Sequence, residues 1–477
     1  MYFDKLYIDG KWTPCHSGQR IEVENPATMA IIGAVPRGGK EDVNHAVDAA
    51  LGAFDGWSKT PMDLRIKLMQ SVLEYMENQR ERLINMELNE IGAPIRWAEA
   101  AHVKAPFSRI RNYIRLMEGF DFEVMLGRSR VVKEPVGVIG CITPWNYPLG
   151  QIVQKVVPAI LCGNTVVLKP SQIAPLSAMV LAEAFEWAGV PAGVFNVVTG
   201  KAGEVGNALA THPHVDMISF TGSTQGGKEV GKLALESIKK IALELGGKSA
   251  NIILKGADYA EAVKAGLGSC FDNAGQTCAA WTRMLVPRAD LELIHQLILE
   301  HSKTFTVGSP DSIDVKVGPV VSRKQYDKVR GYILKGLEEG AEMLLGEVPP
   351  AEPQQGYFVQ PTVFTNVNNS MAIARDEIFG PVVCVIAYDT VEEAIKIAND
   401  TPYGLAGAVF GPESDAKKVA LAMRTGTVYV NNGKRDMDAP FGGYKQSGIG
   451  REGGHWGIEE FLEIKAVFDF PNTVTPL

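Results

Sequence analysis

VGVIGCI, residues 136–142, is an uncharged run of small and branched apolar residues that ends at a Thr-Pro-Trp-Asn turn. Similar runs follow at 165–168 (TVVL), 194–198 (VFNVV) and 217–220 (MISF), with helical patterns between them such as residues 177–188. Runs without a polar face predict strands buried on both sides, which is typical of a parallel sheet wrapped by helices. Such a sheet binds ligands beyond the carboxyl ends of its strands, so functional residues are expected there.

Towards the N-terminus the pattern becomes helical. Apolar residues recur at three- and four-residue steps within 43–54 and again within 64–83, and each set predicts one helix. The first residues, up to 12, alternate like an edge strand. Residues 120–133 are short apolar runs broken by charges, which predicts a projecting pair of strands of the kind that often forms an oligomer contact.

Towards the C-terminus a second α/β unit is expected from about residue 247. The same patterns predict helices near 291–305, 325–337, 391–397 and 416–423, and strands near 382–386 and 427–430. A last alternating segment, 462–468, is expected to pair with the projecting strands. No repeat or flexible linker separates these units, so the domains should be tightly docked.

The composition excludes several classes of function. A chain of 477 residues with 46% hydrophobic content can bury more than one core, and its formal charge of -8 argues against nucleic acid or an anionic membrane as a partner. The uncharged stretch 135–154 is long enough for a membrane span, but its prolines and glycines favour buried strand and loop. The cysteines and histidines lack the spacing of a disulfide framework or a metal site, and no secretory signal is visible, so we expect a metal-free cytoplasmic protein.

Cys278 lies in the stretch NAGQTCAA, residues 273–280, where a helical pattern gives way to a strand. Small neighbours would let a carbonyl group approach the sulfur, and a turn could direct the Cys278 N–H at a developing oxyanion. The alternative is a buried cysteine that acts as a small apolar residue.

Three polar residues follow or end predicted strands. Asn146 could donate to an oxyanion, or it could simply form a turn between prolines. Lys169 could bind a ribose or phosphate, or it could extend into solvent. Glu244 lies between leucines, where burial should raise its pKa and suit it to be a general base, although an edge-strand glutamate facing solvent is an equal alternative.

The segment after residue 220 favours a pyrophosphate site. Ser223 follows Phe220-Thr221-Gly222 and precedes a helical pattern, so it can cap a helix N-terminus. Gly206 ends a separate spaced set of glycines, but the Gly-x-Gly-x-x-Gly fingerprint is not present nearby. Glu377 could accept hydrogen bonds from sugar hydroxyls or cap a loop.

Five motifs occur in one order along the chain, and two more extend the series. They are TPWN (143–146), LKPS (168–171), FTGS (220–223), LELGGK (243–248) and GQTC (275–278), then EIFGP (377–381) and PFGGYKQSG (440–448). With them the whole chain resembles the NAD(P)-dependent aldehyde dehydrogenase superfamily. The resemblance implies an α/β fold with a Rossmann-type cofactor domain (1–119 and 136–246), an α/β catalytic domain (247–445) and an oligomerisation ribbon with the C-terminal strand (120–135 and 446–477).

The resemblance also implies a mechanism. The Cys278 thiolate would attack an aldehyde, the Asn146 amide and the Cys278 N–H would hold the oxyanion, and Glu244 would activate the water that hydrolyses the thioester. Lys169 would belong to the same site, and Glu452 matches a position thought to relay protons. The cofactor, NAD with NADP possible, would lie among Ile142, Trp145, Lys169, Gln172, Gly206, Phe220, Gly222, Ser223, Leu245, Glu377 and Phe379. Family members are usually dimers or tetramers, so a homodimer or homotetramer is expected.

Two departures from the family pattern concern specificity. Gln172 replaces a glutamate common in NAD-preferring relatives, and glutamine does not repel a 2′-phosphate, so NAD is favoured while NADP stays open. Gly150, Gln154 and Asp272 replace bulkier groups and suggest a wider, more polar substrate pocket. The pair Lys434 and Arg435 could attract a substrate carboxylate or be solvated surface charge.

Two rival functions compete with oxidation to the free acid. A CoA-acylating or phosphorylating enzyme would not need Glu244 as a base for water. A non-catalytic structural or binding oligomer would not need the complete set of Cys278, Glu244, Asn146 and Lys169.

Overall fold

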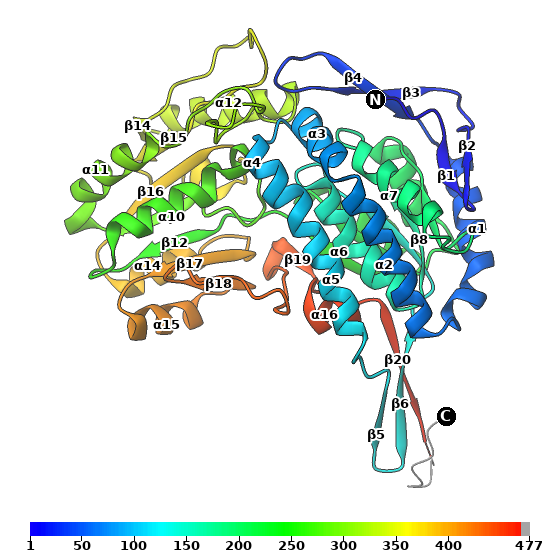
Figure 1. Cartoon of the computed structure of the whole chain (residues 1–477). Coiled ribbons are helices and arrows are strands. Elements are labelled where there is room, and N and C mark those ends of the chain that lie inside the picture. Colours follow the sequence, from blue (N-terminus) through cyan, green and yellow to red (C-terminus); the bar gives the residue numbers. More distant parts are fainter. Residues whose placement is uncertain (469–477) are drawn as a thin grey trace.

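The structure, a computed structural model, describes residues 1–468 of the chain. Figure 1 shows two α/β bodies side by side, with a narrow ribbon of strands that projects from the N-terminal body. The expected α/β architecture is therefore confirmed, whereas the exact domain boundaries stay a prediction. Within the described residues no helix is both long and apolar enough to cross a membrane.

The sheet of the first body contains eight strands within residues 1–468. In spatial order they are β19 (Gly448–Ile449), β11 (Lys240–Glu244), β10 (Met217–Thr221), β7 (Val138–Ile142), β8 (Thr165–Lys169), β9 (Phe195–Val197), β1 (Leu6–Ile8) and β2 (Lys11–Thr13). The central strands β11, β10, β7, β8 and β9 run parallel, and antiparallel partners close both edges. The four strands predicted from apolar runs are confirmed as β7 to β10, and β7, β8 and β10 are buried throughout because both faces are covered.

Helices cover both faces of this sheet. One face packs against α1 (Lys40–Ser58), α8 (Asn207–Thr211) and α9 (Thr224–Leu235). The other face packs against α6 (Pro148–Leu161) and α7 (Leu176–Trp187), with an outer layer of α2 (Met62–Asn78), α3 (Arg80–Ile91) and α5 (Ala105–Met117). Between α3 and α5 lie the short α4 (Ile95–Trp97) and a π-helical turn, η1 (Ala98–Lys104).

One predicted helix is two helices. Residues 64–83 were expected to form a single helix, but α2 ends at Asn78 and α3 begins at Arg80, because Gln79 leaves the helical conformation (φ −94°, ψ 11°). The apolar pattern did not reveal the break. Met76 and Leu83 are both buried and lie seven residues apart, which is also the spacing of two helical turns.

The second body is built on a sheet of seven strands within the described chain. In spatial order they are β14 (Glu342–Leu345), β15 (Thr362–Thr365), β16 (Val382–Tyr388), β13 (Arg283–Pro287), β12 (Ala250–Ile253), β17 (Ala406–Phe410) and β18 (Thr427–Val430). Its helices are α10 (Tyr259–Phe271), α11 (Leu291–Ser302), α12 (Arg323–Glu338), α13 (Ala372–Arg375), α14 (Val391–Asn399) and α15 (Glu413–Ala422). This sheet has its own apolar core, which explains why it forms a separate body.

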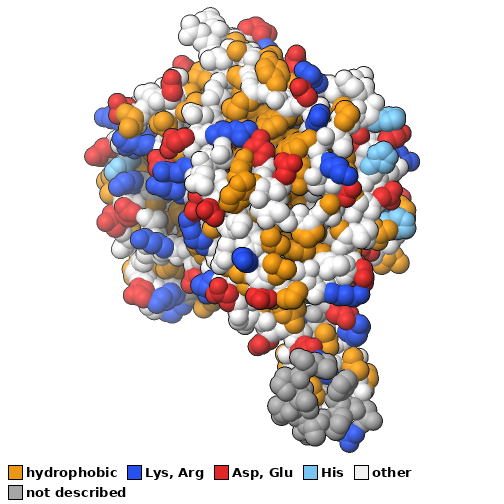
Figure 2. Space-filling model, turned by 45° about the vertical axis from the view of Figure 1, so that its right-hand side comes forward, with side chains coloured by type: hydrophobic (Ala, Val, Ile, Leu, Met, Phe, Trp, Pro, Cys, Tyr) orange, Lys and Arg blue, Asp and Glu red, His pale blue; other side chains and the backbone are white. Residues whose placement is uncertain are grey.

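The projecting ribbon joins segments that are distant in the sequence. β5 (Glu123–Leu126) and β6 (Ser129–Pro135) form a hairpin, and β20 (Leu462–Val467) adds to β6 in antiparallel register. This pairing was expected from the sequence and is confirmed as far as residue 468, and the rest of the predicted C-terminal part lies outside the described residues. Apolar side chains are exposed on the ribbon, beside the grey residues in Figure 2. A two-stranded β3 (Arg20–Glu24) and β4 (Ile31–Pro36) sheet completes the N-terminal region.

Candidate functional site

The strands of the first sheet end at one edge, where the predicted site residues gather. Ile142 at the end of β7 pairs with Phe220 in β10 and with Lys169 in β8. Thr221 in β10 pairs with Glu244 at the end of β11. Parallel strands thus bring residues more than 100 positions apart to the same edge, as the apolar runs predicted.

A cavity of about 430 Å³ opens beside this edge, between the two bodies. Its lining comes from the ends of β7, β10 and β11, from the start of α12 and from the loop before β16. The lining residues are Pro144, Trp145, Asn146, Ile173, Thr221, Gly222, Ser223, Leu245, Gly246, Cys278, Ser322, Lys324, Gln325, Lys328, Glu377 and Phe379. Cys278 and Asn146 therefore share a cavity with the Gly222-Ser223 turn.

Cys278 is presented by an irregular turn. Asn273 and Ala274 have left-handed conformations (φ 54° each), and Gly275 follows at φ 75°, where a Cβ would lie 2.1 Å from the backbone of Gly380. Cys278 is partly exposed, whereas the other five cysteines are buried, so the alternative of a sealed apolar cysteine is wrong. Burial, followed by nearby carboxylates of which Glu244 is the strongest, raises the pKa of the Cys278 thiol to about 12.

Two donors lie close to the sulfur. The Cys278 N–H donates no hydrogen bond within residues 1–468. Asn146 is 3% exposed, and its Nδ2 donates one hydrogen bond to the carbonyl of Gln276 at 3.0 Å. That bond fixes the amide beside the turn and leaves its second N–H hydrogen available, because an amide nitrogen carries two donors.

Glu244 is buried at the end of β11. It is 5% exposed, neither of its carboxylate oxygens has a hydrogen-bond partner in the described part of the chain, and so the solvent-facing alternative is wrong. Burial raises its pKa well above the ordinary value, and the negative charge of Glu452 raises it further. Gly442 makes room for this carboxylate, since a Cβ there would lie 2.6 Å from Glu244 Oε1.

Glu452 reaches the site from the C-terminal segment. Its Oε1 accepts a hydrogen bond from Nζ of Lys155 on α6, and both side chains are buried. The sequence had placed Glu452 near the base by resemblance alone. In the structure the Glu452 charge acts on both Glu244 and Cys278.

Lys169 is 3% exposed, so the alternative that it extends into solvent is wrong. Its Nζ donates to the carbonyl of Pro170 at 2.9 Å, and burial lowers its pKa to about 8. The buried hydroxyl of Thr221, by contrast, has no hydrogen-bond partner within residues 1–468. A buried polar group without a hydrogen-bond partner lowers stability unless a ligand supplies one. The buried groups at this edge therefore favour a ribose or phosphate as ligand.

Ser223 caps α9 as expected. Its Oγ accepts a hydrogen bond from the N–H of Gly226 at 3.1 Å, so the positive end of the α9 dipole faces the cavity opening. Gly227 on the first turn of α9 packs against Leu245, where a Cβ would lie 2.4 Å from its side chain. The helix can approach β11 closely only because this position is glycine.

The far wall of the cavity comes from the second body. Glu377 Oε1 accepts a hydrogen bond from the N–H of Gly247 at 3.1 Å, and a Cβ on Gly246 would lie 2.4 Å from Oε2 of the same carboxylate. Phe379 has a left-handed φ of 61°, and its ring meets Trp145 edge-on with centroids 5.4 Å apart. Glu377 and Phe379 thus complete the cavity opposite the sheet edge.

Several predicted residues lie at the edge but do not line the cavity. They are Ile142, Lys169, Gln172, Gly206, Phe220, Glu244 and Glu452. Gly206 ends the π-helical turn η2 (Ala202–Gly206) and contacts Ile142, since a Cβ there would lie 3.9 Å from Ile142 Cδ1. Their roles stay predictions.

On the other side of the Asn146 turn, residues predicted to line the substrate pocket lie beside Arg109, which was not predicted from the sequence. Gln154 and Arg435 line a second, smaller cavity together with Arg109 on α5. Gly150 lies against Arg109, whereas Lys434 lines none of the cavities described. Burial raises the pKa of Asp272 to about 6. Helix phase groups Arg109 with the buried Tyr113, four residues later, but it does not show which element that face meets.

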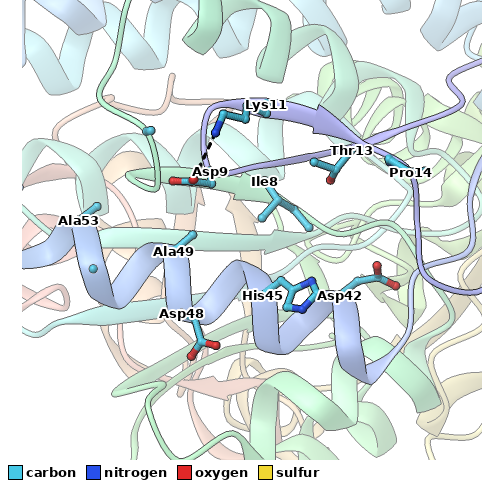
Figure 3. Close-up of a pocket in the computed structure, with 12 residues that line it drawn as sticks. Ile8, Asp9, Lys11, Thr13, Pro14, Asp42, His45, Asp48, Ala49 and Ala53 are labelled. Atoms are coloured by element: carbon cyan, nitrogen blue, oxygen red, sulfur yellow. Dashed lines mark ion pairs between the residues drawn. The ribbon is translucent and has the colours of Figure 1, made fainter.

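A third hollow, of about 640 Å³, lies away from these residues. It is bounded by the β1–β2 hairpin and α1 and includes Asp9, Lys11, Asp42, His45 and Asp48 (Figure 3). Asp42, Asp9 and Lys11 have partners within the fold. Asp42 accepts hydrogen bonds from the N–H groups of Gly39 and His16, and Asp9 lies 4.0 Å from Lys11.

Comparison with known proteins places this geometry among its relatives. The model of the aldehyde dehydrogenase family matches residues 12–467. The chain is 47% identical over 471 residues to a 3-succinoylsemialdehyde-pyridine dehydrogenase of Pseudomonas sp., covering 98% of this chain and 99% of that protein.

Two solved structures are similar over nearly the whole chain. One is a mutant of aldehyde dehydrogenase C of Pseudomonas syringae in complex with NAD+ and octanal (43% identity, TM-score 0.96, covering 99% of this chain and 98% of that chain). Another is a Mycobacterium tuberculosis aldehyde dehydrogenase with NAD+ (41% identity, TM-score 0.96, covering 100% of both chains).

Proposed function

The chain belongs to the aldehyde dehydrogenase family, and we propose that it oxidises an aldehyde to the free carboxylic acid with NAD as hydride acceptor. The observation that supports this most is that Cys278 and Asn146 share one cavity with the Gly222-Ser223 turn. The buried Glu244 carboxylate acts on the Cys278 sulfur electrostatically from the adjoining strand end.

The residues present fit NAD. The N-terminus of α9, capped by Ser223, favours the pyrophosphate, and the buried Lys169 ammonium and Thr221 hydroxyl suit the ribose hydroxyls. Glu377 suits the second ribose from the opposite wall. Bound NAD would accept the hydride that leaves the carbon attached to sulfur. NADP is left open by Gln172, which bears no charge that would repel a 2′-phosphate.

In the proposed first step, the Cys278 thiol loses its proton to solvent, the resulting thiolate attacks the aldehyde carbon, and the carbonyl oxygen becomes negatively charged. The second N–H hydrogen of Asn146 and the Cys278 N–H stabilise that oxygen. Removal of one such donor typically lowers the rate by about 10²–10³. Loss of hydride then leaves a thioester on Cys278.

In the second step, Glu244 takes a proton from the water that attacks the thioester, the carbon–sulfur bond breaks, and the acid is released as Cys278 leaves as a thiolate. Its raised pKa suits this role, because a base is most effective when its pKa is close to the working pH. Glu452, hydrogen-bonded to Lys155, would pass the proton onwards to solvent.

We also propose a homodimer or homotetramer in the cytoplasm. The exposed apolar side chains of the β5–β6–β20 ribbon support assembly, and six unpaired cysteines support a reducing compartment. Light scattering during gel filtration would test the assembly, and a monomer would contradict it.

Product analysis tests the activity directly. Purified protein should convert linear aldehydes to acids with stoichiometric NADH in buffer that contains neither CoA nor phosphate. Cys278→Ala should abolish turnover, whereas the matched change Cys15→Ala, at a cysteine remote from the cavity, should not. Acid that forms only when CoA or phosphate is added would favour the acylating alternative, and no turnover at all would favour a binding role.

A further inference from the structure

The second cavity, of about 280 Å³, contains two positively charged side chains, Arg109 and Arg435. It lies between α5, α6 and the segment before α16 (Gly454–Glu459). The polar side chains that line it are Ser108, Arg109, Asn112, Tyr113, Gln154 and Arg435. Among residues 1–468, no carboxylate lines this cavity.

In the described part of the chain neither Arg109 nor Arg435 forms an ion pair with an acidic side chain. The structure gives Arg109 no ion pair or hydrogen bond there, and Arg435 stacks over the ring of Phe441 at 4.7 Å. Two acidic side chains of this region have other partners, since Glu452, whose charge attracts Arg109, is bonded to Lys155, and Asp438 is bonded to Arg115. Two guanidinium groups that share a half-enclosed cavity repel each other unless an anion joins them.

The arginine cavity and the reactive cysteine flank one turn of the chain. Asn146 lines the cavity of Cys278, and four residues later Gly150 contacts Arg109, where a Cβ would lie 2.9 Å from Nη1. The hydroxyl of Tyr147, one residue after Asn146, lies 2.8 Å from the hydroxyl of Thr277, the residue before Cys278. Any larger side chain at 150 would displace the Arg109 guanidinium.

We propose that the aldehyde oxidised by this protein carries a carboxylate at its distal end, and that Arg109 binds this carboxylate together with Arg435 and the Gln154 amide. The inference rests on the proposed function, because it assigns the far end of a substrate whose aldehyde meets Cys278. Arginine presents paired N–H groups that match a carboxylate, and the amide nitrogen of Gln154 lies within 3.5 Å of a Cβ placed on Gly453, at the same wall as Arg435.

A pair of substrates isolates the charge. A linear ω-oxo carboxylic acid and its methyl ester have the same chain and aldehyde, and only the acid is anionic. Wild-type protein should prefer the acid, at one chain length above others, by roughly 10- to 100-fold in kcat/KM, the range expected for hydrogen bonds to a charged group. Raising the ionic strength should reduce that preference.

Variants identify the residues. Arg109→Gln and Arg435→Gln should each remove most of the preference through KM for the acid and change kcat/KM for the ester less than about threefold. Arg111→Gln is the matched control. Arg111 lies on the same helix and is paired with Glu77 outside the cavity, and its substitution removes the same charge from the protein. This control should change kcat/KM for neither the acid nor the ester.

The outcomes separate the two proposals. Equal use of acid and ester by the wild type, or equal loss of both substrates in the variants, would overturn the arginine site while leaving the aldehyde oxidation intact. Oxidation of neither substrate would refute the proposed function itself. Should Arg109→Gln fold poorly, the more exposed Arg435→Gln and calorimetric binding of the dicarboxylate product to Cys278→Ala would still decide the matter.

Discussion

The Cys278 thiol should be almost fully protonated in the free protein. With its pKa raised to about 12, about one molecule in 10⁴ would hold a thiolate at pH 8. An unperturbed cysteine, with a pKa of about 8.5, is about one quarter thiolate at that pH. Iodoacetamide should therefore alkylate Cys278 roughly 10³-fold more slowly than free cysteine at about pH 8, because only the thiolate reacts.

The pH dependence distinguishes a raised pKa from poor access. Up to about pH 10 the rate at Cys278 should increase about tenfold per pH unit, while the rate of free cysteine levels off above its own pKa. A sulfur limited only by access would keep a constant ratio to free cysteine. Glu244→Gln should accelerate alkylation, since the Glu244 carboxylate is the largest contribution to the pKa after burial. The surface change Glu347→Gln should not.

Mass spectrometry of the peptide that contains Cys278 provides the assay, with Cys278→Ala as the blank. The reasoning would be refuted if the free protein reached a plateau below about pH 9, because the thiolate would then form without help. NAD should accelerate alkylation at constant pH, since the positive nicotinamide ring would lie beside the sulfur.

Four further predictions concern residues of the proposed site. Glu244→Gln should show a burst of NADH followed by slow turnover in rapid mixing, and equal loss of both phases would assign Glu244 to the first step. Because burial lowers the pKa of Lys169 to about 8, the unfolded chain binds more protons than the folded chain between pH 8 and about 10.4. The free energy of unfolding should therefore rise with pH across that window. Lys169→Met should remove this pH dependence, which can be measured from the unfolding midpoint. Glu452→Gln should lower the free energy of unfolding by about 3–5 kcal/mol, because Lys155 loses its buried partner. The double change Lys155→Met with Glu452→Leu should lower it much less. Additive losses in denaturant unfolding curves would contradict the pairing. Gln172→Glu should increase the kinetic preference for NAD over NADP at least about tenfold, and an unchanged ratio would show that this side chain does not meet the adenosine ribose.

Much of the fold was predictable because the positions of the buried strands follow from apolar runs. The segments 136–142 and 217–220 lack a polar face, and only a sheet covered on both sides buries them. The break at Gln79 was not predictable. The apolar spacing on both sides of it is compatible with one continuous helix, so the pattern contained no signal of the interruption.

The sequence predicted which residues lie together at the strand ends better than it predicted their charge states. Strand-end position placed Lys169 and Glu244 correctly, but it could not show that both are buried, because burial depends on segments distant in the sequence, such as Gly442 beside Glu244. Arg109 was missed for a related reason. Three arginines occur close together on α5, and only the helix phase relative to α6 separates the one that enters a cavity from those that face solvent.

The last described segment of the chain has a consequence for synthesis. β19 pairs with β11, β20 pairs with the hairpin, and between them Glu452 meets Lys155, which precedes it by 297 positions. A nascent chain on the ribosome can fold its N-terminal body early. The Lys155 ammonium then stays unpaired until Glu452 is synthesised near the end of translation. Premature termination before residue 448 would therefore yield a protein with a nucleophile and a base but with an unneutralised cation behind them.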